Sequence, residues 1–120
     1  MKRGDVVIVD WPMFRPQGTK QRSKPRPALV IQNDVDNARL TNTILAMITS
    51  VTRRSLEPTQ LLIEIGTPDG TQTGLRQDSV VNCVNLLTVE QTKVLHTIGS
   101  LSATLTQQIN DCLKAALELP

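Results

Sequence analysis

Short runs of apolar residues, separated by polar segments, recur along most of this chain. Each run is rich in β-branched or other aliphatic residues, a composition typical of β-strands. The runs lie at Val6–Val9, Arg26–Asn33, Thr43–Thr49, Leu61–Ile65, Ser79–Leu87 and, as a shorter candidate, Val94–Ile98. In the second run the four residues from Ala28 to Ile31 are all apolar, which predicts a strand buried on both faces or at the centre of a small barrel.

The polar segments between these runs predict loops and turns. Residues 15–26 offer no apolar face to bury, so we expect a solvated loop there. The segment Asn33–Asn42 predicts a loop with one helical turn. The segment Gly66–Gly74 is rich in turn formers, and Pro68-Asp69-Gly70 within it predicts a tight turn.

The spacing of apolar positions changes near the end of the chain. There, apolar residues recur at helical spacing, at Leu105, Ile109, Cys112, Leu113, Ala116 and Leu117. Ser102 is a suitable N-cap for this helix. Five or six short strands followed by a helix predict a mainly β (α+β) fold, in which the helix packs on a small, strongly bent β barrel.

Length and composition agree with a single domain covering residues 1–120. Apolar residues make up 39% of the 120 residues, which suits a globular protein with a modest core. No apolar run reaches the ~18 residues of a membrane span, so no membrane association is expected. The first residues lack the pattern of a secretory signal, and the cytoplasm is the expected location.

The cysteines and the histidine do not form a metal-binding pattern. Cys83 and Cys112 are interpreted as small buried hydrophobic residues, and His96 is the only histidine. A zinc site would need about four closely spaced Cys or His ligands. The sequence therefore predicts no metal site and no cofactor.

Positive charge is concentrated rather than large. The formal net charge is only +2, yet residues 15–26 hold five basic residues and no acidic one. This segment is compatible with a loop that aids solubility or with one that binds phosphate. The first is the usual interpretation of a run of charge, and the second rests on the single sign of the charge and on its ending at Arg26, whose backbone Pro25 and Pro27 hold extended. With one Trp and one Phe in the chain, any RNA binding would depend on charge, hydrogen bonds and shape.

Several motifs, in their order along the chain, resemble those of the PemK/MazF toxins. They are Gly4-Asp5-Val6, Arg26-Pro27-Ala28-Leu29-Val30-Ile31-Gln32-Asn33, Ile48-Thr49-Ser50, Gly74-Leu75, Asp78-Ser79-Val80-Val81, and Gly99-Ser100-Leu101-Ser102 before the final helix. The resemblance spans nearly the whole chain, and its most specific part is the Arg-Pro strand combined with the Thr-Ser strand end. It implies an SH3-like barrel with a C-terminal helix.

The resemblance also implies an activity and partners. The family cleaves single-stranded RNA at short sequences without a metal, leaving 2′,3′-cyclic phosphate and 5′-hydroxyl ends. Its members act as homodimers in type II toxin–antitoxin systems and are inhibited by a cognate antitoxin, here expected to offer an acidic segment. The catalytic pair of the family falls on Arg26 and Thr49 of this chain.

The chemistry of these two residues agrees with the implied roles. A fixed guanidinium at Arg26 would stabilise the charge that builds on a phosphoryl group, and the Thr49 hydroxyl would donate to a phosphate oxygen or orient Arg26. No general base is assigned. Arginine stays protonated, His96 lies outside every matching motif and is interpreted as a structural or surface residue, and Asp10, Asp34 and Asp78 suit turns and strand ends.

The remaining candidates are RNA-binding residues. They are Thr19, Lys20, Arg22, Lys24, Asn33, Ser50, Arg53, Arg54 and Asn85. We expect the basic residues to contact phosphates, and the amides of Asn33 and Asn85 either to contact base edges or to serve in turns and strand ends. The loop 15–26 and the pair Arg53–Arg54 are expected to line one groove, because the third strand would bring Thr49 beside Arg26.

Two other function classes remain open from the residues. One is a barrel-shaped toxin without catalysis that poisons a protein such as a topoisomerase. The other is a catalytically inactive module that only binds nucleic acid. The pairing of Arg26 with Thr49 favours the nuclease, since a binding protein has no need of it.

Overall fold

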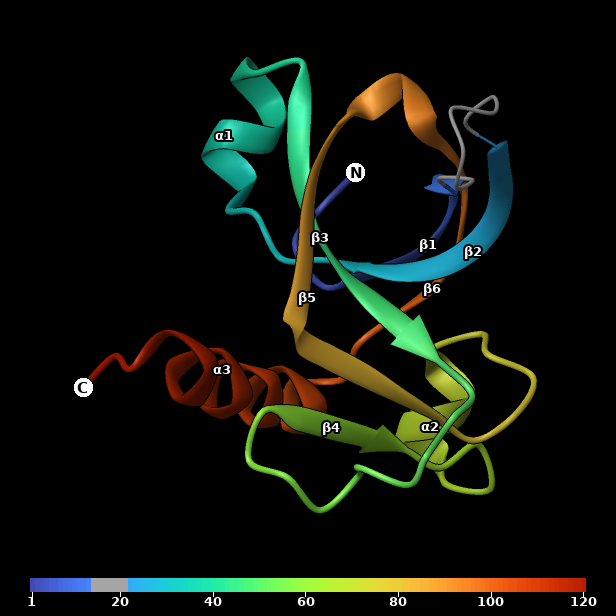
Figure 1. Ribbon diagram of the computed structural model, residues 1–120, viewed down its shortest axis with the longest axis vertical. Helices are drawn as coiled ribbons and strands as arrows, with labels where there is room; N and C mark the ends of the chain where they lie inside the picture. Colours follow the sequence, from blue (N-terminus) through green and yellow to red (C-terminus); the bar gives the residue numbers. More distant parts are fainter. Residues whose placement is uncertain (14–21) are drawn as a thin grey trace, which may run out of the picture.

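The computed structural model describes the backbone of residues 1–13 and 22–120 and the side chains of residues 1–10 and 24–120. Its elements are β1 (Asp5–Met13), β2 (Arg22–Val30), α1 (Asp34–Arg39), β3 (Asn42–Thr49), β4 (Gln60–Ile63), α2 (Pro68–Gln72), β5 (Ser79–Glu90), the 3-10 turn η1 (Gln91–Lys93), β6 (Val94–Ser100) and α3 (Ala103–Leu117). The described strands form one antiparallel sheet in the order β4-β5-β3-β2-β1-β6, which curls strongly (Figure 1). The sheet is strongly bent, as predicted, but its two edge strands, β4 and β6, are not paired with each other.

The structure differs from the expectations most clearly at β2 and at α2. The strand predicted at Arg26–Asn33 begins at Arg22 and ends at Val30, so residues 22–26 of the expected basic loop are strand. They pair with β1, where Met13 stands opposite Arg22, and this partner is not visible in the local sequence. The tight turn expected at Pro68-Asp69-Gly70 is the short helix α2, which Thr67 caps by accepting a hydrogen bond from the Gly70 N–H.

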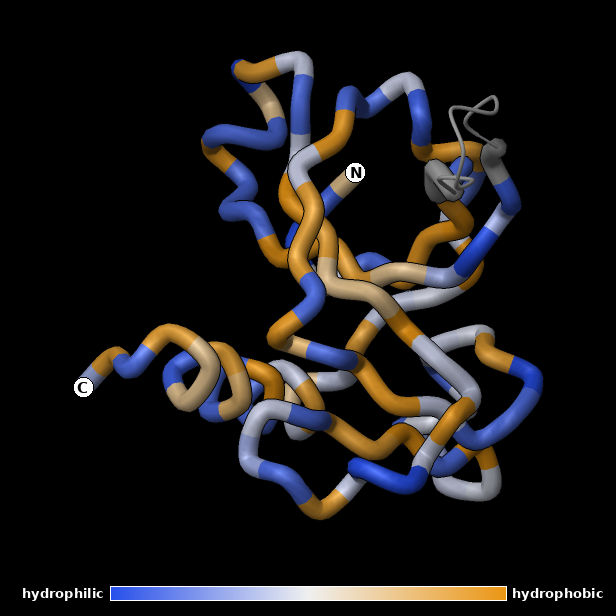
Figure 2. The backbone as a smooth tube through the Cα atoms, viewed as in Figure 1, coloured by the Kyte–Doolittle hydropathy of each residue, from blue (hydrophilic) through white to orange (hydrophobic). Residues whose placement is uncertain are grey.

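The sheet is apolar on both faces, and each face carries its own core. Side chains alternate along a strand, so neighbours point to opposite faces. Val6, Leu29 and Ala46 join the core that packs against α3, whereas Val7 and Leu45 join a second core on the other face. Ala28, Leu29 and Val30 are fully buried, which confirms that the second run is covered on both faces. Figure 2 shows these hydrophobic stretches along the central strands and hydrophilic residues in many of the connections.

A bulge in β5 bends the sheet. Ala46 pairs with Leu86, but the next residue, Met47, pairs with Asn82, so Cys83, Val84 and Asn85 are inserted opposite this step. The first half of β5 lies beside β4 and near α3, and the second half continues toward η1 (Figure 1).

The C-terminal helix packs one stripe on the sheet. Ser102 caps it, accepting a hydrogen bond from the Leu105 N–H at 3.2 Å, as predicted. Leu105, Ile109 and Cys112 are buried, but Leu117, expected in the same stripe, is 54% exposed. The C-terminal end of α3 extends away from β4 and the rest of the sheet (Figure 1). Of the helices in residues 1–13 and 22–120, none has the length and hydrophobicity to cross a membrane.

Both cysteines, Cys83 on β5 and Cys112 on α3, are buried free thiols in the core between the sheet and α3, as predicted. Burial raises the pKa of the Cys83 thiol to about 12, and the neighbouring Cys112 thiol adds to this effect. Burial also raises the pKa of Cys112. Since the thiolate is the reactive form, both thiols should react slowly with reagents in solution, because they are buried and because they stay protonated.

The packing of α3 should depend on Ile109, which is 1% exposed. We expect Ile109→Ala to lower the free energy of unfolding by about 2–5 kcal/mol, through lost burial and the cavity that remains. Leu117→Ala on the same helix should change it by no more than about 0.5 kcal/mol. Urea unfolding followed by circular dichroism measures both. Equal effects would show that α3 does not dock through the Ile109 face.

The cysteines should be inert in the folded protein. With Ellman's reagent at pH 8 we expect negligible labelling of the native chain and labelling of both Cys83 and Cys112 in 6 M guanidinium chloride, about 6 M being sufficient to unfold most small domains. Rapid labelling of either thiol without denaturant would contradict its burial. Adding 2 M urea serves as a control for partial opening, since about 2 M lies below the unfolding midpoint of a stable domain.

Candidate active site

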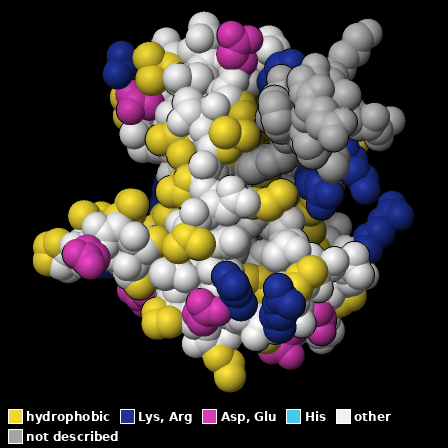
Figure 3. Space-filling model, viewed as in Figure 1, with side chains coloured by type: hydrophobic (Ala, Val, Ile, Leu, Met, Phe, Trp, Pro, Cys, Tyr) yellow, Lys and Arg dark blue, Asp and Glu magenta, His cyan; other side chains and the backbone are white. Residues whose placement is uncertain are grey.

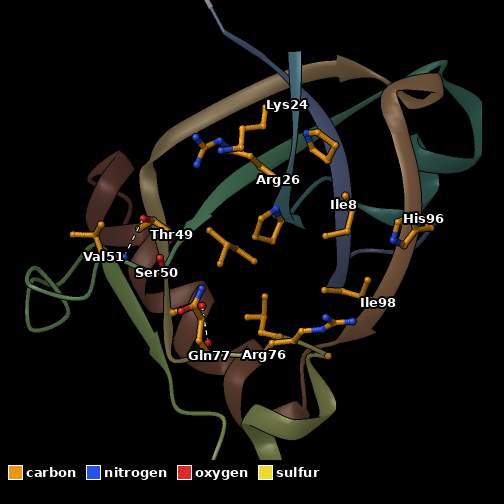
Figure 4. Close-up of a pocket in the computed structure, with 16 residues that line it drawn as sticks. Ile8, Lys24, Arg26, Thr49, Ser50, Val51, Arg76, Gln77, His96 and Ile98 are labelled. Carbon is orange, nitrogen blue, oxygen red and sulfur yellow. Dashed lines mark hydrogen bonds between the residues drawn. The ribbon is translucent and has the colours of Figure 1, made fainter. Parts of the chain in front are cut away.

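A pocket of about 720 Å³ opens where β2 and β3 separate. Residues 24–27 of β2 and residues 48–51 at the end of β3 supply one part of its wall. Residues 74–77, which precede β5, and Ser79, its first residue, supply another part, and Ile8, His96 and Ile98 of β1 and β6 complete the wall (Figure 4). Segments far apart in the sequence therefore meet here.

Two prolines explain why the strands separate at this point. Val30 of β2 accepts a hydrogen bond from Gly4 on the β1 side, and the Ile31 N–H donates to Ile44 on the β3 side. By the alternation of an antiparallel strand, residues 27 and 25 also direct their backbone nitrogens toward β3. Both are proline and have no N–H to donate. The β2–β3 pairing stops at Ala28↔Met47, immediately before Pro27.

The interrupted pairing places Arg26 near Thr49. Continued by two residues on each strand, the register Ala28↔Met47 would set Arg26 directly opposite Thr49. Because side chains repeat every second residue, the two would also share one face of the sheet. Both line the pocket, and in Figure 4 the Arg26 side chain extends toward the side on which Thr49 lies.

Thr49 is held in a defined orientation. Its Oγ1 accepts a hydrogen bond from the Val51 N–H at 3.2 Å, drawn as a dashed line in Figure 4. A hydroxyl that accepts from the backbone keeps its own proton available to donate. Thr49 is half-buried, as is Arg26, while Ser50 and Lys24 on the same wall are exposed.

Arg76 and Gln77 also line the pocket, and sequence analysis missed them. The Ser79 hydroxyl donates to the Gln77 carbonyl oxygen at 2.8 Å, which fixes this segment at the start of β5. The only local signal was their place between Gly74-Leu75 and Asp78-Ser79, two of the motifs on which the family resemblance rests.

His96 is exposed, as expected of a surface residue, but it faces the pocket. It stands opposite Ile8 in the β1–β6 pairing, and Ile98, two residues further, is on the same side of β6. Figure 4 shows His96 and Ile98 on the side of the pocket away from Thr49. His96 is far from Arg26 and Thr49 along the chain, so the sequence did not indicate that it would reach the same pocket.

Four predicted RNA-binding residues lie elsewhere. Asn33 caps α1, with its Oδ1 accepting from the Asp36 N–H at 2.8 Å. Asn85 lies in the β5 bulge and donates to the Met47 Sδ at 3.0 Å. Arg53 and Arg54 follow β3 in an exposed segment and do not line this pocket, so the structure does not bring them into one groove with Arg26.

Some predicted residues lie outside the described part of the structure. Thr19 and Lys20 belong to residues 14–21, and for Arg22 only the backbone is described, at the start of β2. Of the basic residues expected in this loop, only Lys24 and Arg26 have described side chains, and both line the pocket.

The pocket is electropositive. Lys24, Arg26 and Arg76 line it, and no Asp or Glu is among its described lining residues. In Figure 3, Lys and Arg side chains gather at the side of the molecule where β2 and the segment after α2 approach each other. No cluster of three or more His, Cys, Asp or Glu side chains suited to a metal occurs in the described ranges. The arrangement suits an anionic ligand with a phosphoryl group near Arg26 and Thr49.

Comparison with known proteins gives a consistent result. The family model of the PemK-like, MazF-like toxins of type II toxin–antitoxin systems matches residues 2–117. Endoribonuclease MazF6 of Mycobacterium tuberculosis (strain ATCC 25618 / H37Rv) is 34% identical over 110 residues, covering 91% of this chain and 92% of the relative. Endoribonuclease EndoA of Bacillus subtilis (strain 168) is 29% identical over 119 residues, covering 99% and 96%.

A solved endoribonuclease structure has a similar fold. The chain superposes on a mycobacterial endoribonuclease solved in complex with its cognate antitoxin with a TM-score of 0.76 and 23% identity, covering 100% of this chain and 97% of the other. This likeness confirms the predicted fold type, a curled antiparallel sheet with a C-terminal helix. On the family match and the sequence identity, this chain belongs to the PemK-like, MazF-like toxins of type II toxin–antitoxin systems.

Proposed function

We propose that this chain, acting as one toxin domain over residues 1–120, is an endoribonuclease that cleaves single-stranded RNA in the pocket between β2 and β3. The observation that carries the proposal is the convergence of Arg26 and Thr49 on that pocket from two different strands. The relatives at about 30% identity that are named endoribonucleases support the reaction class.

The reaction uses the nucleophile that RNA itself supplies. The 2′-oxygen attacks the adjacent phosphorus, a bond forms between them, and the bond from phosphorus to the 5′-oxygen breaks. The 2′-hydroxyl loses its proton and the departing 5′-oxygen gains one. The products are a 2′,3′-cyclic phosphate and a 5′-hydroxyl, and the balance requires neither a metal nor a cofactor.

Arg26 and Thr49 would stabilise the charge that develops on the phosphoryl oxygens. The guanidinium offers paired N–H donors in a fixed fork, which match two oxygens of one phosphate. The Thr49 proton is free to donate, because the hydroxyl oxygen is already engaged by the Val51 N–H. Donors placed before the reaction lower its barrier more than donors that must reorient.

Proton transfer is not assigned to either residue. Arginine remains protonated near neutral pH, so Arg26 cannot accept the 2′-hydroxyl proton, and threonine is a poor acceptor for the same step. Water in the open pocket or a phosphate oxygen of the substrate takes this role in the proposed reaction.

The proposed contacts beyond the cleaved bond are mainly with the RNA backbone. Lys24 and Ser50 would hold the flanking phosphate from the pocket wall. RNA that extends further would meet the other predicted residues, namely Thr19, Lys20, Arg22, Asn33, Arg53, Arg54 and Asn85. We further propose a cytoplasmic homodimer inhibited by an acidic segment of a cognate antitoxin, for which the electropositive pocket offers a complementary surface.

The competing functions predict different results. A toxin that poisons a protein such as a topoisomerase, or an inactive nucleic-acid-binding module, would leave RNA intact. Neither explains why an oriented threonine and an arginine fork meet at one pocket.

Cleavage should not depend on divalent cations. We expect the purified chain to cut a long single-stranded RNA equally well in excess EDTA and in magnesium, because the attacking group is the 2′-oxygen of the RNA. Product ends, tested by polynucleotide kinase labelling, should be 5′-hydroxyl. Loss of cleavage on chelation with recovery in magnesium would reject this mechanism, and intact RNA under both conditions would favour the competing functions.

Arg26 and Thr49 should contribute unequally to the cleavage rate. We expect Arg26→Ala to lower kcat by about 100-fold or more, the typical cost of removing an oxyanion donor, and Arg26→Lys to recover only part, since an ammonium lacks the fork. Thr49→Ala should be milder, and Thr49→Ser should retain more activity because it keeps the hydroxyl. Single-turnover cleavage measures all four. Arg39→Ala, outside the pocket, is the matched control; a folded Arg26→Ala protein with wild-type kcat would show that the assignment is wrong.

A further inference from the structure

The pocket has a second polar side that the proposed cleavage step does not use. Arg76 and His96 both line it, and Figure 4 shows Arg76 extending toward the side of Ile98 and His96, away from Arg26 and Thr49. Ile8 and Ile98 contribute apolar surface on this side of the pocket. The pocket thus offers cationic and polar groups at two places, and the second of them has apolar surface beside it.

Close backbone packing joins the two elements that carry these side chains. A Cβ at Gly74 would collide with the carbonyl oxygen of Ile98, and a Cβ at Gly99 would collide with the carbonyl group of Thr73. Gly74 also has φ +75°, a conformation that favours glycine. The segment before Arg76 and the strand that holds His96 therefore fit against each other without side chains between them, which gives this side of the pocket a fixed form.

The charge on Arg76 is not neutralised within the described part of the chain. Its nearest acidic residue in sequence, Asp78, accepts a hydrogen bond from the Ile65 N–H at 3.0 Å and does not line the pocket. No salt bridge within residues 1–13 and 22–120 involves Arg76. A guanidinium left facing a pocket without a carboxylate is suited to an anionic group from a ligand.

We propose that Arg76 and His96 form a second nucleotide subsite, which holds the nucleotide adjacent to the bond cleaved beside Arg26. The inference rests on the proposed function, since it assigns the second subsite to the same RNA. Arg76 contacts the phosphate of this adjacent nucleotide, and the His96 ring hydrogen-bonds to its sugar or to an edge of its base. Ile8 and Ile98 contact the same base. A pocket of about 720 Å³ lies within the range of about 300–1,000 Å³ that encloses small organic ligands, so it has room for more than the cleaved phosphate.

The test measures binding separately from cleavage. A fluorescent single-stranded oligonucleotide with 2′-deoxy sugars cannot be cleaved by the 2′-hydroxyl route, and its dissociation constant is measured by anisotropy over a salt series. We expect Arg76→Gln to weaken binding about tenfold, as for one charge-assisted hydrogen bond, and to reduce the slope of log K against log salt by about 0.7. With RNA, we expect Arg76→Gln and His96→Gln to raise KM more than they lower kcat.

Lys114→Gln is the matched control, because Lys114 is exposed on α3 and lies outside the pocket. It removes the same charge and should leave the salt slope unchanged. Circular dichroism verifies that each variant is folded. If Arg76→Gln binds the oligonucleotide with wild-type affinity and slope, the subsite is rejected.

The two proposals fail in different ways. Arg26-dependent RNA cleavage that neither Arg76→Gln nor His96→Gln affects would overturn the subsite and keep the nuclease. Absence of RNA cleavage together with Arg76-dependent oligonucleotide binding would overturn the nuclease and retain a nucleotide-binding surface at Arg76. An equal loss of binding in Arg76→Gln and Lys114→Gln would mean that only net charge matters, and would overturn the subsite.

Discussion

The site depends on two hydrogen bonds that β2 cannot make. Pro25 and Pro27 direct their nitrogens toward β3 but carry no N–H, so the pairing of these strands stops at Ala28↔Met47. Up to that point the register is fixed, and it would set Arg26 opposite Thr49 two residues later. The strands therefore separate only after their alignment has been determined. A guanidinium and a hydroxyl that would otherwise be neighbours on a continuous sheet instead face an opening that a phosphate can enter.

This arrangement is stiff because the strands that bear it are buried on both faces. Val7, Ala28 and Leu45 belong to one core, while their chain neighbours Val6, Leu29 and Ala46 belong to the other. A shift of register by one residue would exchange the two sets of side chains, and both cores would lose their packing. The position of Arg26 relative to Thr49 is thus maintained by apolar contacts that are some residues distant from either. The helix α3 contributes to the same end by covering one of these cores.

The sequence predicted what local patterns determine and missed what depends on distant partners. Runs such as Val6–Val9 and Thr43–Thr49, and the Ser102 cap of α3, are local features, and the strands and the helix occur where these features indicated. The extension of β2 back to Arg22 depends on pairing with Met13, and the β5 bulge depends on β3, so neither was visible. The site divides in the same way. Arg26 and Thr49, which both line the pocket, were predicted from motifs, whereas His96 reaches the pocket through the β1–β6 pairing, which no motif records.

The charge of the pocket bears on both of its proposed partners. Lys24, Arg26 and Arg76 line one pocket with no carboxylate among the described lining residues, so their mutual repulsion is relieved only by an anionic ligand or by counterions. RNA relieves it with phosphates, and an acidic antitoxin segment would relieve it with carboxylates. RNA and the antitoxin segment need not bind in the same geometry. In the proposed reaction one phosphate meets the Arg26 fork and the Thr49 proton together, whereas a segment that binds across the pocket would block access of that phosphate without reproducing its position. The proposed antitoxin segment would therefore compete with RNA for the same basic residues without imitating the shape of RNA.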